Sequence, residues 1–119
     1  MNTSKPLYVR VIASTESVLV RLAGELDLDS APLVDRAVDS CLGHGVRRVT
    51  VDLAAVTFCD SHGLMALERS GRIASACGVT FRLSGIHRRL WSILSLYREG
   101  SLPGVGVPSL VRPEARAYR

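Results

Sequence analysis

Hydrophobic and polar residues alternate along two short segments near the start of the chain. Residues 7–13 and 17–22 both show the period of two that is typical of β-strands, and a short polar stretch separates them. This pattern predicts a hairpin, and residues 24–27 (Gly-Glu-Leu-Asp) lead out of its second strand into a loop. Two later segments, at residues 47–53 and 79–83, also alternate and are interpreted as further strands.

Between these strands the hydrophobic period changes to about 3.6 residues, which is typical of helices packed on a sheet. Ser30 precedes the first such segment and is the expected N-cap. Pro32 fits its first turn, where proline is tolerated, and Gly43 ends it. A second helix is predicted from Ser61 to Gly78, a glycine that provides a stop signal.

The two later helices have apolar faces that can be named residue by residue. In the second helix this face is Leu64, Leu67, Gly71 and Ala74, flanked by Met65, Ile73 and Cys77, while Glu68, Arg69 and Arg72 face away. A third helix is expected to be capped by Ser84, with an apolar stripe formed by Ile86, Leu90, Ile93, Leu94 and Tyr97.

The predicted order of elements is β-β-α-β-α-β-α. It indicates a single α/β domain, with helices packed on a mixed sheet of four to five strands. A chain of 119 residues has room for one such core. Residues 1–6 are interpreted as an N-terminal tail and residues 7–100 as the domain. Residues 101–119 are rich in proline and glycine and are expected to add at most a short edge strand and a frayed tail.

Composition narrows the classes of function. Hydrophobic residues make up 47% and charged residues 22%, an ordinary globular balance. No apolar run approaches the roughly 20 residues of a membrane span, and no export signal is visible, so we expect a cytoplasmic protein. The net charge is +4, but its arginines form short pairs (residues 47–48 and 88–89) and aromatics are few. This distribution does not favour a nucleic-acid partner.

Cys41, Cys59 and Cys77 are odd in number and widely spaced, and we interpret them as small buried hydrophobes. No cluster with the spacing of a metal site occurs, and no glycine-rich phosphate loop. The sequence therefore predicts neither a metal nor a cofactor.

The segment 49–64 has the most informative chemistry. A buried strand runs to the corner Asp60-Ser61-His62-Gly63, from which the second predicted helix departs. Ser61 is therefore expected at or next to a helix N-terminus, where amide groups and the helix dipole favour an anion. Two interpretations follow: an activated nucleophile, or a hydroxyl that accepts a phosphoryl group. The second is favoured.

Two observations argue against the nucleophile and hence against an enzyme. The corner lacks the first glycine of the Gly-x-Ser-x-Gly elbow of hydrolases. Ser61 and His62 are neighbours in the chain, so on a helix they point apart and cannot act together as nucleophile and base. His44 and His87 are alternative bases, but each is interpreted as a surface residue.

The segments Gly24-Glu25-Leu26-Asp27, Val51-Asp52-Leu53 and Val56–Leu64 resemble the STAS domain of bacterial anti-sigma factor antagonists, over roughly residues 7–100. The resemblance implies a non-enzymatic protein that binds a GHKL-type serine kinase, which doubles as an anti-sigma factor, and so releases a sigma factor. It also implies that the kinase phosphorylates Ser61 and that a phosphatase removes the phosphate. The chain departs from the family at His62, where a small Ser or Thr is usual, and in its proline-rich end.

The residues expected to form the partner surface are Asp27, Asp60, His62, Gly63 and Leu64. Simpler roles compete with three of these assignments: a helix cap for Asp60, a solvated turn residue for Asp27, and a tolerated exposed side chain for His62. The rival function is a STAS-type interaction module in a signalling or transport complex, in which Ser61 is never phosphorylated.

Overall fold

The computed structural model describes residues 6–100, with side chains up to residue 96. Its elements are β1 (Leu7–Ala13), β2 (Ser17–Leu26), α1 (Ala31–Cys41), β3 (Arg48–Cys59), α2 (Ser61–Ala76), β4 (Thr80–Ser84) and α3 (Arg88–Gly100). The predicted order β-β-α-β-α-β-α and the α/β fold class are therefore confirmed.

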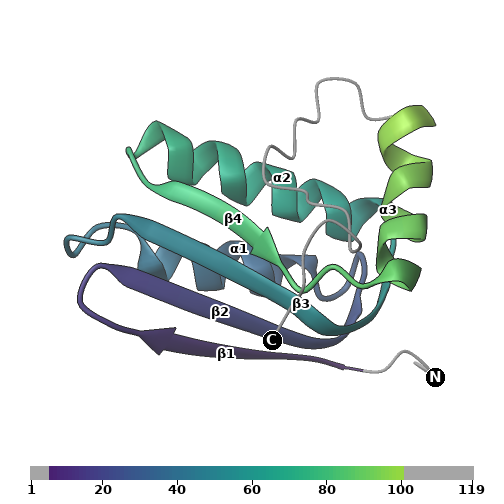
Figure 1. The fold of residues 1–119 in the computed structure, drawn as a ribbon, viewed down its shortest axis with the longest axis horizontal. Helices are drawn as coiled ribbons and strands as arrows, with labels where there is room; N and C mark the ends of the chain where they lie inside the picture. The colour runs from purple at the N-terminus through teal and green to yellow at the C-terminus, as the bar shows by residue number, and fades with distance from the viewer. Residues whose placement is uncertain (1–5, 101–119) are drawn as a thin grey trace.

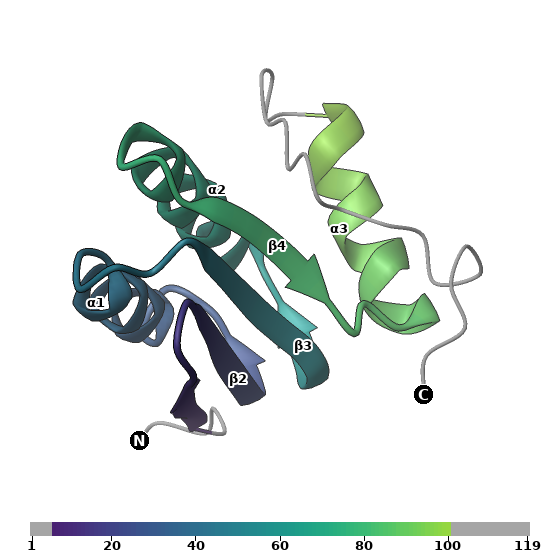
Figure 2. The ribbon, with the colours of Figure 1, turned by 60° about the vertical axis from the view of Figure 1, so that its left-hand side comes forward.

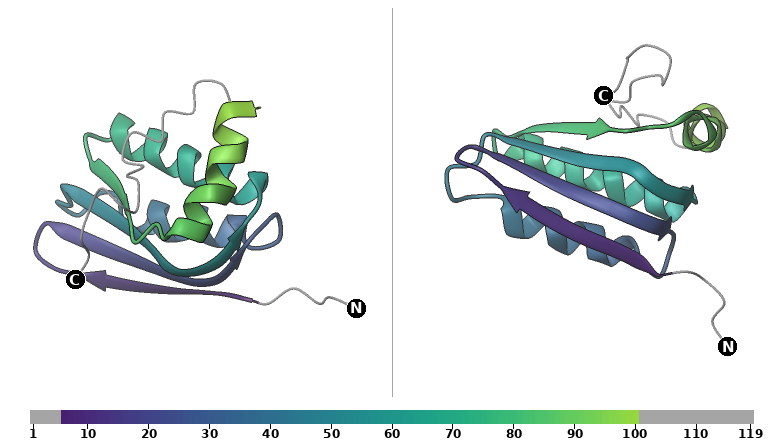
Figure 3. Two further views of the ribbon diagram at one scale, coloured as in Figure 1. Left: turned by 45° about the vertical axis from the view of Figure 1, so that its right-hand side comes forward. Right: turned by 60° about the horizontal axis from the view of Figure 1, so that its bottom comes forward.

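The four strands form one mixed sheet in the order β1-β2-β3-β4 (Figure 1). Strands β1 and β2 are an antiparallel hairpin, whereas β2, β3 and β4 run parallel to one another. Helices α1 and α2 cover one face of the sheet (Figure 2). Helix α3 lies beyond the ends of β3 and β4 (Figure 3). This arrangement brings the carboxyl ends of the parallel strands to one edge, where α1 and α2 begin.

Strands β2 and β3 are both longer than their hydrophobic alternation predicts. The pairing of β2 with β3 is interrupted twice, once between Arg21 and Ala23 and again between Gly24 and Glu25. At each interruption β3 contributes an extra residue, so the inward positions are three residues apart there rather than two. These positions are Leu53, Val56 and Cys59, all buried. A search for a period of two therefore recognises only the first half of β3.

One hydrophobic core fills the space between the sheet and the helices. Its fully buried large side chains come from every layer: Val20, Leu22, Leu26, Val34, Val38, Val49, Leu53, Leu64, Leu67, Ile86, Leu90 and Leu94. The inner faces of β2 and β3 meet α1, α2 and the start of α3 in this cluster. None of the helices in the described part has the length and hydrophobicity that crossing a membrane requires.

The helix starts differ from the prediction in two places. Ser30 occupies the N-cap position of α1, but its side chain makes no cap hydrogen bond and turns back into the preceding loop. Helix α3 begins at Arg88, and the expected cap Ser84 is instead the last residue of β4. The side chain of Tyr97 and the whole of residues 101–119 lie outside what the structure describes.

Two further expectations about burial are wrong. Cys77 is exposed, whereas Cys41 and Cys59 are buried as predicted. Glu68 was placed on the outer side of its helix, yet it is buried, and its Oε2 has no hydrogen-bond partner. Burial raises the pKa of Glu68, and nearby Arg72 partly opposes this effect. The 3.6-residue period alone could not show this, because the helix is enclosed on more than one side.

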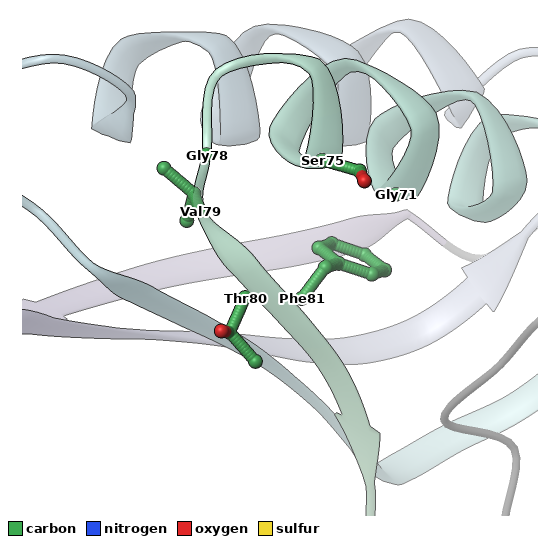
Figure 4. Close-up of a pocket in the computed structure, with 6 residues that line it drawn as sticks. All are labelled: Gly71, Ser75, Gly78, Val79, Thr80 and Phe81. Atoms are coloured by element: carbon green, nitrogen blue, oxygen red, sulfur yellow. The ribbon is translucent and has the colours of Figure 1, made fainter.

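A shallow open pocket of about 330 Å³ lies between the second half of α2 and β4 (Figure 4). It is lined by Gly71, Ser75, Gly78, Val79, Thr80 and Phe81. The ring of Phe81 packs on Gly71, where an added Cβ would lie 3.1 Å from ring atom Cδ2. This pocket is at the opposite end of α2 from Ser61 and contains no acid, base or cysteine side chain.

Candidate functional site

Ser61 is the first residue of α2, directly after the end of β3, which confirms its predicted place at a helix N-terminus. Asp60 is the N-cap: its backbone is extended and its Oδ1 accepts a hydrogen bond of 2.9 Å from the amide of Gly63. The Asp60 amide in turn donates to the Leu26 carbonyl (3.1 Å), which joins the corner to the end of β2. The corner is therefore held by bonds from both sides.

Gly63 is required by the closeness of α2 to β2. A Cβ on this residue would lie 2.5 Å from the Leu26 carbonyl oxygen, 2.7 Å from Leu26 Cγ and 3.0 Å from Cys59 Sγ. No real side chain is found at such distances, so any larger residue would push the first turn of α2 away from the sheet. Gly63 thus fixes where Ser61 stands rather than offering a surface to a partner.

Ser61 itself is partly exposed. Its hydroxyl makes no hydrogen bond to any residue that the structure describes, and the same holds for the amides of Ser61 and His62. These two amides belong to the first turn of α2, where the partial positive charge of the helix dipole is concentrated. The corner therefore combines a free hydroxyl with donors that suit an added anion.

A second loop, residues 27–30, leaves the sheet directly beside this corner, since Leu26 pairs with Cys59. Asp27 Oδ1 accepts a hydrogen bond of 3.0 Å from the Ser30 amide, and Ser30 Oγ accepts one of 2.9 Å from the Asp27 amide. The Ser30 hydroxyl also lies 2.9 Å from the Glu25 carbonyl. Asp27 is therefore more than a solvated turn residue, because it holds the loop in shape.

His62 and Leu64 have opposite environments. The side chain of His62 is 52% exposed, and its Nδ1 lies 3.9 Å from Asp60 Oδ1. Its ring makes no hydrogen bond to the Ser61 hydroxyl within the described residues. Leu64 is fully buried in the core. Its side chain therefore has no surface to offer a partner.

Three large exposed apolar side chains lie on the segments that adjoin the corner, and sequence reasoning missed them. Leu28 in the neighbouring loop is 59% exposed. Phe58 and Met65, which precede and follow Ser61 in the chain, are 40% and 42% exposed. Leu28 could have been noticed as an apolar residue between two aspartates in a predicted loop. Large exposed apolar side chains around a polar centre are typical of protein-binding surfaces.

Cys59 lies under the corner and is buried. Burial, with a smaller contribution from the negative charge of Asp60, raises the pKa of its thiol to about 12. The thiol therefore stays neutral at physiological pH and lacks the thiolate that redox chemistry needs. Cys59 is part of the packing, as predicted.

His87 is a second residue that the sequence did not reveal. It is half-buried rather than a plain surface residue. Its Nδ1 accepts a hydrogen bond of 3.2 Å from the Leu90 amide, so it caps α3, and its Nε2 lies 2.8 Å from the Val56 carbonyl. Since Nδ1 is the acceptor, the proton is on Nε2, which donates to Val56. His87 thus ties α3 to the strand that leads to Ser61.

Comparison with known proteins agrees with this geometry. The family model described as "Mlab, STAS domain" matches residues 9–104, which is most of the chain. The chain belongs to the STAS domain family. No curated protein sequence matches it.

Solved structures with the same fold are functionally diverse. A STAS-domain antisigma-factor antagonist from Rhodobacter sphaeroides is 21% identical (TM-score 0.60), with 67% of this chain and 87% of that chain covered. The phosphorylated Bacillus cell fate determinant SpoIIAA is 19% identical (TM-score 0.63; 88% and 90% covered). The murine anion transporter Slc26a9 is also 19% identical (TM-score 0.63), with 74% of this chain but only 15% of the transporter covered. At these identities the likeness concerns the fold.

Proposed function

We propose that this STAS domain is an anti-sigma factor antagonist: it binds an anti-sigma serine kinase of the GHKL type, releases a sigma factor, and is switched off by phosphorylation of Ser61. The observation that supports this most strongly is the partly exposed Ser61 hydroxyl at the start of α2, which, like the amides of Ser61 and His62 beside it, has no hydrogen-bond partner among residues 6–100. Two structural neighbours, the antisigma-factor antagonist from Rhodobacter sphaeroides and the phosphorylated form of SpoIIAA, are consistent with this proposal.

The first step of the proposed switch is that the domain tolerates the phosphate. A phosphoserine carries about −1.5 to −2 charges at neutral pH. At the first residue of α2 this charge meets the positive end of the helix dipole and the free amides of Ser61 and His62. Since Asp60 already uses Oδ1 to cap Gly63, the cap need not be rearranged. The fold is therefore expected to survive modification.

The second step is that the partner does not tolerate it. Unmodified, the corner offers a partner the exposed apolar side chains of Leu28, Phe58 and Met65 around a small neutral serine. Phosphorylation puts a dianion in the middle of this surface and beside the carboxylates of Asp60 and Asp27. Burying that charge against a partner costs desolvation and like-charge repulsion, so dissociation is favoured. A phosphatase later hydrolyses the phosphate ester, which releases inorganic phosphate and restores the Ser61 hydroxyl.

The test is to incubate the protein with candidate anti-sigma kinases and Mg-ATP and to measure added phosphate by mass spectrometry. We expect one phosphate on the unmodified chain and none on Ser61→Ala. Ser75→Ala is the matched control, because Ser75 is an exposed serine on the same helix. Labelling that persists in Ser61→Ala would overturn the assignment of the site.

Kinase binding tests the switch separately from the modification. Ser61→Asp should weaken binding by at least about tenfold, since it adds charge where the partner packs. His62→Ser restores the small residue usual in the family and measures whether the histidine contributes to docking. Unchanged affinity of Ser61→Asp would contradict the switch even if Ser61 is phosphorylated.

The likeness to an anion transporter supports a second candidate function, a STAS interaction module that is never phosphorylated. Under this alternative, kinases leave Ser61 unlabelled, while the apolar surface of Leu28, Phe58 and Met65 still docks a partner. Replacement of Met65 by Asp would then abolish partner binding, and Ser61→Asp would weaken it as a steric and charge defect only.

A further inference from the structure

The face of the sheet opposite α1 and α2 is covered by no helix of the described part. In the right-hand view of Figure 3 the strands lie in front of α1 and α2, and α3 lies beyond the end of the sheet. The side chains of this outer face alternate with the buried positions of each strand. They are Tyr8, Arg10 and Ile12 of β1, Ser17, Leu19, Arg21, Ala23 and Glu25 of β2, Arg48, Thr50, Asp52, Ala55 and Phe58 of β3, and Thr80, Arg82 and Ser84 of β4.

Positive charge is concentrated on this outer face. Four exposed arginines, one on each strand, stand there against two acids: Arg10, Arg21, Arg48 and Arg82 against Asp52 and Glu25. Arg21 is paired with Asp52 at 3.3 Å, and Arg48 bonds Ser17 Oγ at 3.1 Å. Arg10 and Arg82 make no ion pair within the described residues. Four arginines, one aspartate and one glutamate give the face a net charge of +2.

A short apolar strip, formed by Ile12 and Leu19, lies on the same face between the arginines. Ile12 pairs with Leu19, which pairs with Thr50, so these three side chains stand side by side on neighbouring strands. Ile12 is exposed and Leu19 half-buried, and Tyr8 at the edge is 68% exposed. Arg10 and Arg21 lie one row to one side of the strip, and Arg48 lies to the other. An apolar centre with an arginine-rich rim is the usual composition of a protein-binding surface.

The charge and side-chain types of the outer face limit which class of partner can bind there. A second copy docked face to face would oppose +2 with +2, which is unfavourable. Single-stranded nucleic acid requires a series of aromatic side chains for base stacking, and the described outer face has two well-separated ones, Tyr8 on β1 and Phe58 at the end of β3. Carboxylates match arginine in charge and in the geometry of paired hydrogen bonds. The favoured partner therefore presents an apolar ridge flanked by Asp or Glu.

We propose that the outer sheet face is a second docking surface, which binds an acidic amphipathic segment of a partner protein independently of Ser61. It lies on the broad face of the sheet, whereas Ser61 stands at the edge where β3 ends. One domain can then hold two proteins at once and act as an adaptor between a partner at the Ser61 corner and a partner at the sheet.

The test uses a synthetic helical peptide with a leucine stripe flanked by glutamates, and a matched peptide with lysines in place of the glutamates. Binding is measured by fluorescence anisotropy at low and at high salt. We expect the acidic peptide to bind, more weakly at high salt, and the basic peptide not to bind. Arg10→Ser with Arg82→Ser should weaken binding by about five- to tenfold, since two exposed charge pairs are lost.

The control variant is Arg36→Ser with Arg88→Ser, which removes the same charge from exposed positions on α1 and α3. It should bind as the unmodified protein does, and so should Ser61→Asp, which separates this proposal from the phosphorylation switch. Equal loss in both double variants, or equal binding of the basic peptide, would overturn the proposal. So would preferential binding of single-stranded RNA or of phosphatidylglycerol vesicles over the acidic peptide.

Discussion

Two loops leave the same edge of the sheet side by side, and each begins with an aspartate that bonds the amide three residues later. Asp27 Oδ1 accepts from Ser30 at 3.0 Å, and Asp60 Oδ1 accepts from Gly63 at 2.9 Å. Each loop also contains one serine. Ser30 is buried, and its hydroxyl is used within the loop. Ser61 is partly exposed, and its hydroxyl has no partner among the described residues.

The position of the serine relative to the aspartate explains this difference. Ser30 is the third residue after Asp27, so its side chain turns back over the loop and reaches the Glu25 carbonyl. Ser61 is the first residue after Asp60, so the aspartate caps the helix without it. One serine has therefore become part of the structure, while the other is available for chemistry. This difference between Ser30 and Ser61 can be tested by substitution, beginning with Gly63, whose contact with Leu26 joins the two loops.

The largest effect is expected from Gly63→Ala. Alanine normally favours a helix over glycine by about 1 kcal/mol. Here the new Cβ would meet Leu26 at 2.5 Å, so we expect a net loss of about 2–3 kcal/mol in the free energy of unfolding. Urea denaturation measures it. Gly71→Ala is the control in the same helix, because its Cβ would meet only the Phe81 ring at 3.1 Å. A smaller loss for Gly63→Ala than for Gly71→Ala would contradict the close contact.

The next effect separates the two serines directly. Ser30→Ala should lower the free energy of unfolding by about 1–2 kcal/mol, because it leaves the partly buried amide of Asp27 without its acceptor. Ser61→Ala should change it by less than about 0.5 kcal/mol, since its hydroxyl has no partner in the described part. Thermal or urea unfolding of the two variants decides the matter. Similar losses of unfolding free energy in the two variants would show that the Ser61 hydroxyl also stabilises the fold. It would then not be available for phosphorylation in the way proposed.

The sequence predicted the fold and the corner from strong local signals. The change of hydrophobic period after Asp60 placed Ser61 at the start of α2, and the hairpin and the helix order followed from alternation and stop residues. It could not predict the length of β3, because two irregularities in the pairing with β2 shift the inward positions. Nor could it separate Ser30 from Ser61, since their roles depend on which carbonyl each hydroxyl reaches in space.

His87 and Glu68 were misplaced for a related reason. Each belongs to a helix or its approach, where the chain pattern identifies one buried face only. His87 became a cap because β3 brings the Val56 carbonyl within 2.8 Å, a contact over 31 residues of chain. Glu68 became buried because α2 is enclosed on a second side. Long-range packing of this kind leaves no local signal.

A smaller change in the free energy of unfolding tests whether the Asp60 carboxylate stabilises its loop through a hydrogen bond, as the Asp27 carboxylate does in residues 27–30. Asp60→Ala should cost about 1 kcal/mol of unfolding free energy, and Asp60→Asn only a few tenths, because asparagine keeps the acceptor oxygen for the Gly63 amide. Asp29→Ala, an exposed aspartate of the other loop, is the control and should be nearly neutral. If asparagine and alanine cost the same, the charge of Asp60 matters more than its hydrogen bond.

Glu68 differs from Asp27 and Asp60, and its replacement is expected to have the smallest effect on the free energy of unfolding, with the opposite sign. The carboxylates of Asp27 and Asp60 accept hydrogen bonds from backbone amides, whereas Glu68 Oε2 is buried with no partner among the described residues. Glu68→Met is therefore expected to raise the free energy of unfolding at pH 7, by up to about 1 kcal/mol.

The pH dependence of that gain follows from the sign of the pKa shift. Burial raises the folded-state pKa of Glu68, so the folded protein binds its proton more tightly than the unfolded chain does. Stability from this group is full below the ordinary glutamate pKa of about 4.3 and is lost as pH rises through the raised value. Urea midpoints of the two proteins should therefore lie closest near pH 4 and separate toward pH 7. A gap that is constant with pH would mean that the methionine acts only by packing.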